Sequence, residues 1–212
     1  MTLRTLSWLK EGLISALFPP SCAACGALDS EPFCAICAQQ NEWAPRFSLP
    51  EVEQVWAAFR YEGPVREAIH ALKYGARPEL GLRLGRAMAR RLPFVGEVIV
   101  PVPIAGHALG ARGYNQAREL ARGLCGCVRP RALMRRNRHQ EQVGLDREAR
   151  RRNIAGAFAA GPAAASVRGL DVLLVDDVIT TGATIEACTR VLKEAGAKGV
   201  RAAALAYTVS GF

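Results

Sequence analysis

The sequence predicts an α/β protein with a mostly parallel sheet, helices on both faces of that sheet, and a small cysteine-rich module at the N-terminus. Three observations lead to this prediction. Strand-like and helix-like segments alternate from about residue 52 onward, which is typical of open α/β sheets. The apolar run 172–175 has no polar interruption, as expected for a strand buried on both faces. Two C-x-x-C pairs lie close together before residue 40, in a segment with little apolar core of its own.

The composition is that of a folded globular protein. Half of the 212 residues are hydrophobic and 22% are charged, which excludes intrinsic disorder and collagen-like chains. This length accommodates one ordinary domain and a small appendage. No apolar stretch approaches the ~18 residues that a membrane-spanning helix needs, and the first 20 residues lack the features of a signal peptide. We therefore expect a cytoplasmic protein without a membrane span.

The first 50 residues are expected to form an N-terminal helix and the cysteine-rich module, and residues 51–212 the main domain. Leucines at helical spacing predict the amphipathic helix, and these are Leu6, Leu9, Leu13 and Leu17. The polar tract 39–42, followed by Pro45 and Pro50, predicts the exit from the module. The boundary is therefore placed near residue 50.

The main domain is expected to begin with a strand at 52–61. Pro64 suits the first position of a helix that ends near Tyr74, because that position needs no backbone N–H. The next expected elements are a helix at 78–92, a strand at 98–102 and a helix at 115–123. The chain then ends in a βαβ unit with a strand at 172–175, a helix at 184–195 and a strand at 199–208.

The two cysteine pairs have the spacing of a tetrahedral zinc site. Seven cysteines is an odd number, which favours a reducing compartment and metal binding over disulfides. The expected ligands are Cys22, Cys25, Cys34 and Cys37. Four thiolates leave no open position for water, so Zn²⁺ here is expected to be structural. The alternative is four free surface thiols.

The segment that follows the apolar run 172–175 combines adjacent carboxylates with small and hydroxyl-bearing residues. Its members are Asp176, Asp177, Thr180, Thr181, Gly182, Ala183 and Thr184. The N–H groups and hydroxyls of 180–184 can hold the phosphate of a ribose 5-phosphate at a helix N-terminus. The two carboxylates can accept hydrogen bonds from the ribose hydroxyls or contact Mg²⁺ through water. The alternative is a solvated turn and an ordinary helix cap.

The whole run 172–184 resembles the 13-residue phosphoribosyl-pyrophosphate (PRPP) binding signature of type I phosphoribosyltransferases. The resemblance extends in order along nearly the full chain to the ComF family. Besides the cysteines and the PRPP loop, its motifs are Leu-Lys73-Tyr, Pro101-Val-Pro103, Arg112-Gly-Tyr-Asn-Gln116, Gln142-Val-Gly-Leu145 and Arg150-x-x-Asn153. The resemblance implies a Rossmann-like type I phosphoribosyltransferase fold behind a zinc finger. It also implies an association with DNA uptake during natural transformation.

The resemblance also suggests roles for residues outside the PRPP loop. It implies that the diphosphate of PRPP is contacted by Lys73, Arg112, Gly113, Tyr114 and Asn115, and that a flexible loop closes over the ligand with Gln142, Arg150 and Asn153. A guanidinium suits bidentate contact with diphosphate. From the residues alone, Arg112 and Asn115 equally fit a surface charge and a helix cap, and Lys73 a cation at a helix C-terminus.

A strongly basic stretch accounts for much of the net charge of +9. Residues 129–152 contain nine arginines against three acidic residues. The stretch fits a solvated helix face, a lid over diphosphate, or a track for single-stranded DNA. It contains no aromatic residue for base stacking, which favours contacts with phosphates over contacts with bases.

The sequence is compatible with two functions. The favoured one is a PRPP-binding factor in DNA uptake, with single-stranded DNA or uptake-machinery proteins as partners. The alternative is a Mg²⁺-dependent phosphoribosyltransferase in which Asp176 and Asp177 are the catalytic pair. No acceptor-binding segment is recognisable in the sequence, so whether the protein is an enzyme stays undecided.

Overall fold

A computed structural model describes residues 20–28, 30–93, 95–124, 126–136, 154 and 156–208. The predicted N-terminal helix lies outside the described residues, as do Gln142, Arg150 and Asn153. Among the described helices, none is long and apolar enough to cross a membrane.

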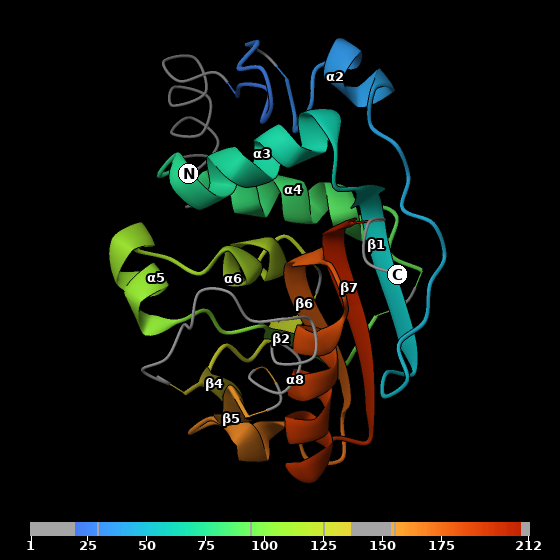
Figure 1. Cartoon of the computed structure of the whole chain (residues 1–212), viewed down its shortest axis with the longest axis vertical. Coiled ribbons are helices and arrows are strands. Elements are labelled where there is room, and N and C mark those ends of the chain that lie inside the picture. The colour runs from blue at the N-terminus through green and yellow to red at the C-terminus, as the bar shows by residue number, and fades with distance from the viewer. Residues whose placement is uncertain are drawn as a thin grey trace, which may run out of the picture.

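The core of the protein is a sheet of five parallel strands (Figure 1). In spatial order the strands are β1 (Gln54–Arg60), β7 (Gly199–Tyr207), β6 (Asp171–Ile179), β2 (Val98–Pro101) and β3 (Cys127–Val128). The two longest strands, β6 and β7, pair over their full length at the centre. The predicted parallel sheet is therefore confirmed.

Apolar residues of β6 face both sides of the sheet in alternation. Val172 and Leu174 belong to one hydrophobic cluster, and Leu173 and Val175 belong to the other. All four side chains are at most 1% exposed. This two-sided burial explains why the sequence of the strand shows no polar alternation.

Helices cover both faces, as predicted. One face packs against α3 (Gly63–Tyr74), α4 (Glu79–Ala89) and most of α6 (Gln116–Ala121). The other face packs against α8 (Ala183–Glu194) and a hairpin of β4 (Leu133–Arg135) and β5 (Phe158–Ala160). The remaining elements are α2 (Ala35–Gln39), α5 (Gly106–Arg112) and the 3₁₀ helix η1 (Ala164–Val167).

The predicted elements of the main domain are all present, with ends shifted by a few residues, and the structure differs from expectation in two places. Strand β6 continues to Ile179, so Asp176 and Asp177 lie within the strand and not in a loop after it. The reason is that β7 runs equally far and pairs with β6 up to Tyr207. The described first residues of the basic stretch, 129–136, form a turn followed by strand β4, so a helix face is the wrong description of them.

The segment between the cysteines and β1 packs against the sheet. Phe47 stacks on Tyr207 with ring centroids 4.1 Å apart, and Leu49 and Val52 belong to the core on the α8 face. Trp43 forms an antiparallel bridge with Phe59 on β1. The segment predicted to be an exit from the module therefore covers part of the sheet, and the division at residue 50 stays a prediction.

The cysteine-rich module docks on α4 and the segment before it. The guanidinium of Arg77 donates to Ser21 Oγ at 3.1 Å, and that of Arg83 donates to the carbonyl oxygen of Ser30. Phe33 of the module meets Phe59 edge to face, with ring centroids 6.1 Å apart. These contacts hold the module against the α3–α4 face of the sheet, where Figure 1 shows it.

Candidate functional site

Two adjacent carboxylates lie near the carboxyl end of β6, in the middle of the sheet. Asp176 and Asp177 are both buried, with exposed fractions of 8% and 4%. The backbone N–H of Asp177 donates to Asp176 Oδ1 at 2.8 Å. The carboxyl ends of parallel strands are where ligands bind in open α/β sheets. The two predicted catalytic residues therefore occupy the expected edge of this sheet.

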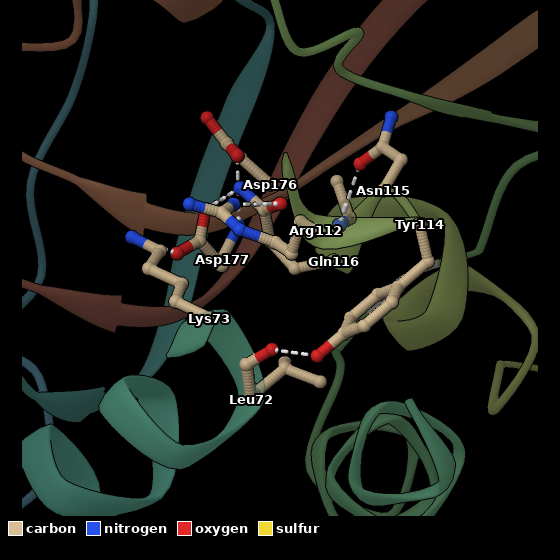
Figure 2. A network of polar contacts seen from close by, with 9 residues as sticks. Leu72, Lys73, Arg112, Tyr114, Asn115, Gln116, Asp176 and Asp177 are labelled. Atoms are coloured by element: carbon tan, nitrogen blue, oxygen red, sulfur yellow. Dashed lines mark hydrogen bonds and ion pairs between the residues drawn. The ribbon is translucent and has the colours of Figure 1, made fainter. Parts of the chain in front are cut away.

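The last turn of α3 brings Lys73 to the same place (Figure 2). Its ammonium forms an ion pair with Asp177 Oδ2. Burial acts to lower the pKa of Lys73, but the attraction of Asp177 and then of Asp176 outweighs it and the pKa is raised. Lys73 therefore stays charged and presents a fixed cation beside the carboxylates.

The segment 112–116 connects α5 to α6, and hydrogen bonds hold it to α3 and to the end of β2. Gly113 has φ +78°, which ends α5, and the hydroxyl of Tyr114 donates to the carbonyl oxygen of Leu72 on α3. Asn115 caps α6 by accepting from the N–H groups of Ala117 and Arg118, and its Nδ2 donates to Val102 O at 2.9 Å. The side chain of Asn115 thus forms hydrogen bonds with backbone groups and caps the helix, which was one of the two alternatives for this residue.

Gln116 has no role expected from the sequence, although it ends the Arg-Gly-Tyr-Asn-Gln motif. It is only 6% exposed. Its Nε2 donates to Asp177 Oδ1 at 3.3 Å, and its Oε1 accepts from Arg112 at 2.7 Å. Figure 2 shows Arg112, Gln116 and Asp177 in one connected network with Lys73 alongside. Gln116 and Asp177 are 61 positions apart, so no local pattern in the sequence indicates this contact.

The predicted phosphate-binding segment 180–184 forms the turn from β6 into α8. Gly182 is the N-cap of α8 with φ +80°, and Thr181 Oγ1 accepts from the N–H of Ala183 at 3.4 Å. Thr180 is exposed, and Thr181 and Thr184 are half-buried. The free N–H groups of a helix start favour an anion here.

A cavity of about 340 Å³ lies between α3 and α5. Lys73 and Arg112 supply its cationic groups, and the ring of Tyr74 lies 5.3 Å from the Arg112 guanidinium carbon. The remaining lining residues are Ala76, Ala108 and Ala111. Two cations at a cavity next to the carboxylates of β6 suit a ligand that carries several negative charges.

Burial and the neighbouring charge of Asp177 raise the pKa of Asp176 well above its usual range. The ionised form of Asp176 therefore opposes folding. The free energy of unfolding falls as pH rises above the unfolded-state pKa of about 3.9, and it keeps falling until pH passes the raised pKa of the native state. Asp176→Asn should raise Tm at neutral pH, by about 2–4 °C for each 1 kcal/mol gained in a chain of this size.

That gain should vanish in acid, because the native carboxyl is then protonated as well. Thermal unfolding of both proteins across pH measures the difference. A Tm difference that does not change with pH would show that the charge of Asp176 is not what the substitution relieves.

The four predicted zinc ligands lie together. Their sulfur atoms are all within 4.8 Å of one another, and Cys25 Sγ is 3.7 Å from Cys34 Sγ. Tetrahedral Zn–S bonds of about 2.3 Å place sulfur atoms about 3.8 Å apart. The cluster therefore fits structural zinc.

Comparisons with known proteins agree with this geometry. The phosphoribosyl transferase domain family matches residues 108–211. The chain is 30% identical over 203 residues to the DNA utilization protein YhgH of Salmonella typhi, covering 89% of this chain and 84% of that protein. For YhgH of Escherichia coli K12 the identity is 29% over 205 residues, with the same coverage. Competence protein F of Haemophilus influenzae is 33% identical over 114 residues, 52% of this chain and 50% of that protein. A phosphoribosyl transferase domain, a four-cysteine cluster and these relatives together place the chain in the ComF family.

Proposed function

We propose that this protein binds PRPP at the carboxyl end of β6 and acts in DNA uptake or use. The observation that carries the proposal is the convergence of Asp176, Asp177, Lys73 and Arg112 at the edge of the sheet where α8 begins. Carboxylates suit ribose hydroxyls, cations suit a diphosphate, and a helix start suits a phosphate.

The orientation of the ligand follows from these preferences. The ribose hydroxyls lie against Asp176 and Asp177, and the 5-phosphate lies in the segment 180–184. The diphosphate extends into the cavity between α3 and α5, where Lys73 and Arg112 contact it. The carboxylates of Asp176 and Asp177 would hold Mg²⁺ through water, and the ion would neutralise negative charge on the diphosphate. Gln142, Arg150 and Asn153 remain predicted contacts.

Asp177→Asn should weaken PRPP binding roughly 10- to 100-fold, because a hydrogen bond to a charged group contributes about 1.5–3 kcal/mol. Isothermal titration calorimetry with PRPP and Mg²⁺ measures the change. Asp171→Asn is the matched control, because Asp171 starts the same strand and is also ion-paired, with Lys198 at 3.0 Å. Equal PRPP affinity in Asp177→Asn and the native protein would rule out this placement of the ribose.

The proposed cellular role draws on the relatives, which are named for DNA utilization and for competence. The charge of this chain supports it, since a net charge of +9 favours anionic partners. The proposed partners are single-stranded DNA or proteins of the uptake machinery, on the cytoplasmic side of the membrane. In the described part of the basic stretch, Arg131, Arg135 and Arg136 are exposed.

Affinity for single-stranded DNA should fall steeply with salt, with a log–log slope of about −0.7 for each phosphate that is neutralised. Replacing Arg131, Arg135 and Arg136 with alanine should therefore flatten the slope by up to about 2. Fluorescence anisotropy with a labelled oligonucleotide measures this. The matched control replaces three exposed arginines on α3, on α4 and at the C-cap of α4, which are Arg66, Arg86 and Arg90. Equal slopes in both triple variants would exclude the basic stretch as the DNA contact.

The alternative function is phosphoribosyl transfer from PRPP to a nitrogen acceptor, which the match to a phosphoribosyl transferase domain favours. Charge stabilisation and orientation by the groups at β6 suit such a reaction. Incubation with PRPP, Mg²⁺ and a panel of bases and amines, with diphosphate release as readout, separates the two proposals. Diphosphate release by the native protein that is lost in Asp177→Asn would establish that the protein is an enzyme.

A further inference from the structure

We propose that Gln116 is a positioning residue that holds the carboxylate of Asp177 at a fixed distance from the guanidinium of Arg112. The inference rests on the proposed PRPP site and adds to it the residue that connects its ribose side to its diphosphate side. Gln116 is the first residue of α6 and bridges the two groups with one amide, donating to Asp177 and accepting from Arg112 (Figure 2).

The chemistry of the two partners suits an amide at this position. A guanidinium only donates hydrogen bonds and an ionised carboxylate only accepts them. A group between them must therefore accept on one side and donate on the other. Glutamine does both, whereas glutamate would place a second carboxylate against Asp177 and methionine would form neither bond.

The surroundings make the bridge rigid. The cap formed by Asn115 fixes the start of α6, and its Nδ2 ties that start to Val102 at the end of β2. Lys73 holds Asp177 Oδ2, while Gln116 holds Oδ1. Both oxygens of the carboxylate are thus oriented by the protein, which lowers the entropy cost of binding a ligand in one geometry.

Gln116→Glu tests the proposal through its pH profile. The charged groups around the introduced carboxyl are Asp176 and Asp177 on β6, Lys73 on α3, Arg112 on α5 and Glu119 on α6. When protonated, the introduced carboxyl can donate to Asp177 and accept from Arg112, as the amide does. When ionised, it repels Asp177. We expect the ratio of the PRPP Kd of Gln116→Glu to that of the native protein to be near one in acid and to rise roughly 10-fold toward neutral pH.

Gln116→Met is the matched control, because it keeps the length of the side chain and removes both hydrogen bonds. Its PRPP affinity should be weaker by roughly 5- to 10-fold, with a ratio to the native protein that does not change with pH. The Kd of the native protein is measured at every pH as well. Titration of PRPP and of the surrounding groups affects both proteins, so its effect cancels in the ratio of the two Kd values. A pH-independent ratio for Gln116→Glu, or native affinity in Gln116→Met, would overturn the positioning role.

A failure of the PRPP proposal is visible separately, because the native protein would then show no binding in the same titration. Thermal unfolding tests the bridge without ligand. The Tm of Gln116→Glu should fall relative to the native protein as pH rises, while the Tm difference of Gln116→Met should stay constant. Parallel Tm profiles for all three proteins would refute the bridge itself.

Discussion

Gly182→Ala is expected to weaken PRPP binding at least 10-fold and to lower the stability of the protein by about 2 kcal/mol or more. Two causes add. Gly182 has φ +80°, a conformation that costs an L-residue about 1–2 kcal/mol. A Cβ atom there would also lie 2.2 Å from Cδ2 of Leu49, which is buried in the core. Either the Leu49 side chain or the turn 180–184 must move, and a turn that moves no longer points its N–H groups at the proposed phosphate position.

Differential scanning calorimetry and PRPP titration measure the two effects. Gly169→Ala separates the causes, because Gly169 has φ +74° but open space around the position of a Cβ, so its loss of Tm reports the backbone strain alone. Adding Leu49→Ala to Gly182→Ala should remove the clash and leave the strain. If Gly182→Ala bound PRPP as the native protein does, the segment 180–184 would not be the phosphate site.

The packing around residue 182 gives a reason for the glycine at this position. In the structure, the Cβ direction points to Leu49 on the segment before β1. The position of the turn 180–184 therefore depends on a residue more than 130 positions earlier in the chain.

Loss of the metal is expected to unfold the cysteine-rich module. A structural zinc contributes about 10–16 kcal/mol of apparent folding free energy in small modules, more than the few apolar residues of 20–40 supply. Cys37→Ser removes a buried ligand from the cluster. We expect bound zinc to fall from one ion per chain to a small fraction, and residues 20–40 to become sensitive to protease.

Metal analysis and limited proteolysis with mass spectrometry check this expectation. Cys127→Ser is the matched control, because Cys127 is exposed on β3 and is not part of the cluster. The zinc content of Cys127→Ser should therefore equal that of the native protein. A fully loaded, protease-resistant Cys37→Ser protein would exclude the four-thiolate site.

Local sequence patterns determined most of the fold. The apolar run at 172–175, the glycine and threonines before α8, and the paired cysteines each describe segments of fewer than 20 residues. Backbone periodicity and ligand spacing are properties of such short segments. For this reason the sheet, the helices on both faces and the cysteine cluster could be predicted without coordinates.

The connections within the site were decided only by the tertiary structure. Lys73 and Asp177 come from α3 and β6, Gln116 reaches Asp177 from 61 positions away, and Leu49 packs against Gly182. No periodicity links residues so far apart in the chain. Their contacts depend on which faces of the helices pack against the sheet and on how far each strand pairs with its neighbour, as the extension of β6 to Ile179 illustrates. The sequence thus determined which chemical groups are available, and the packing of the helices on the sheet decided which of them meet.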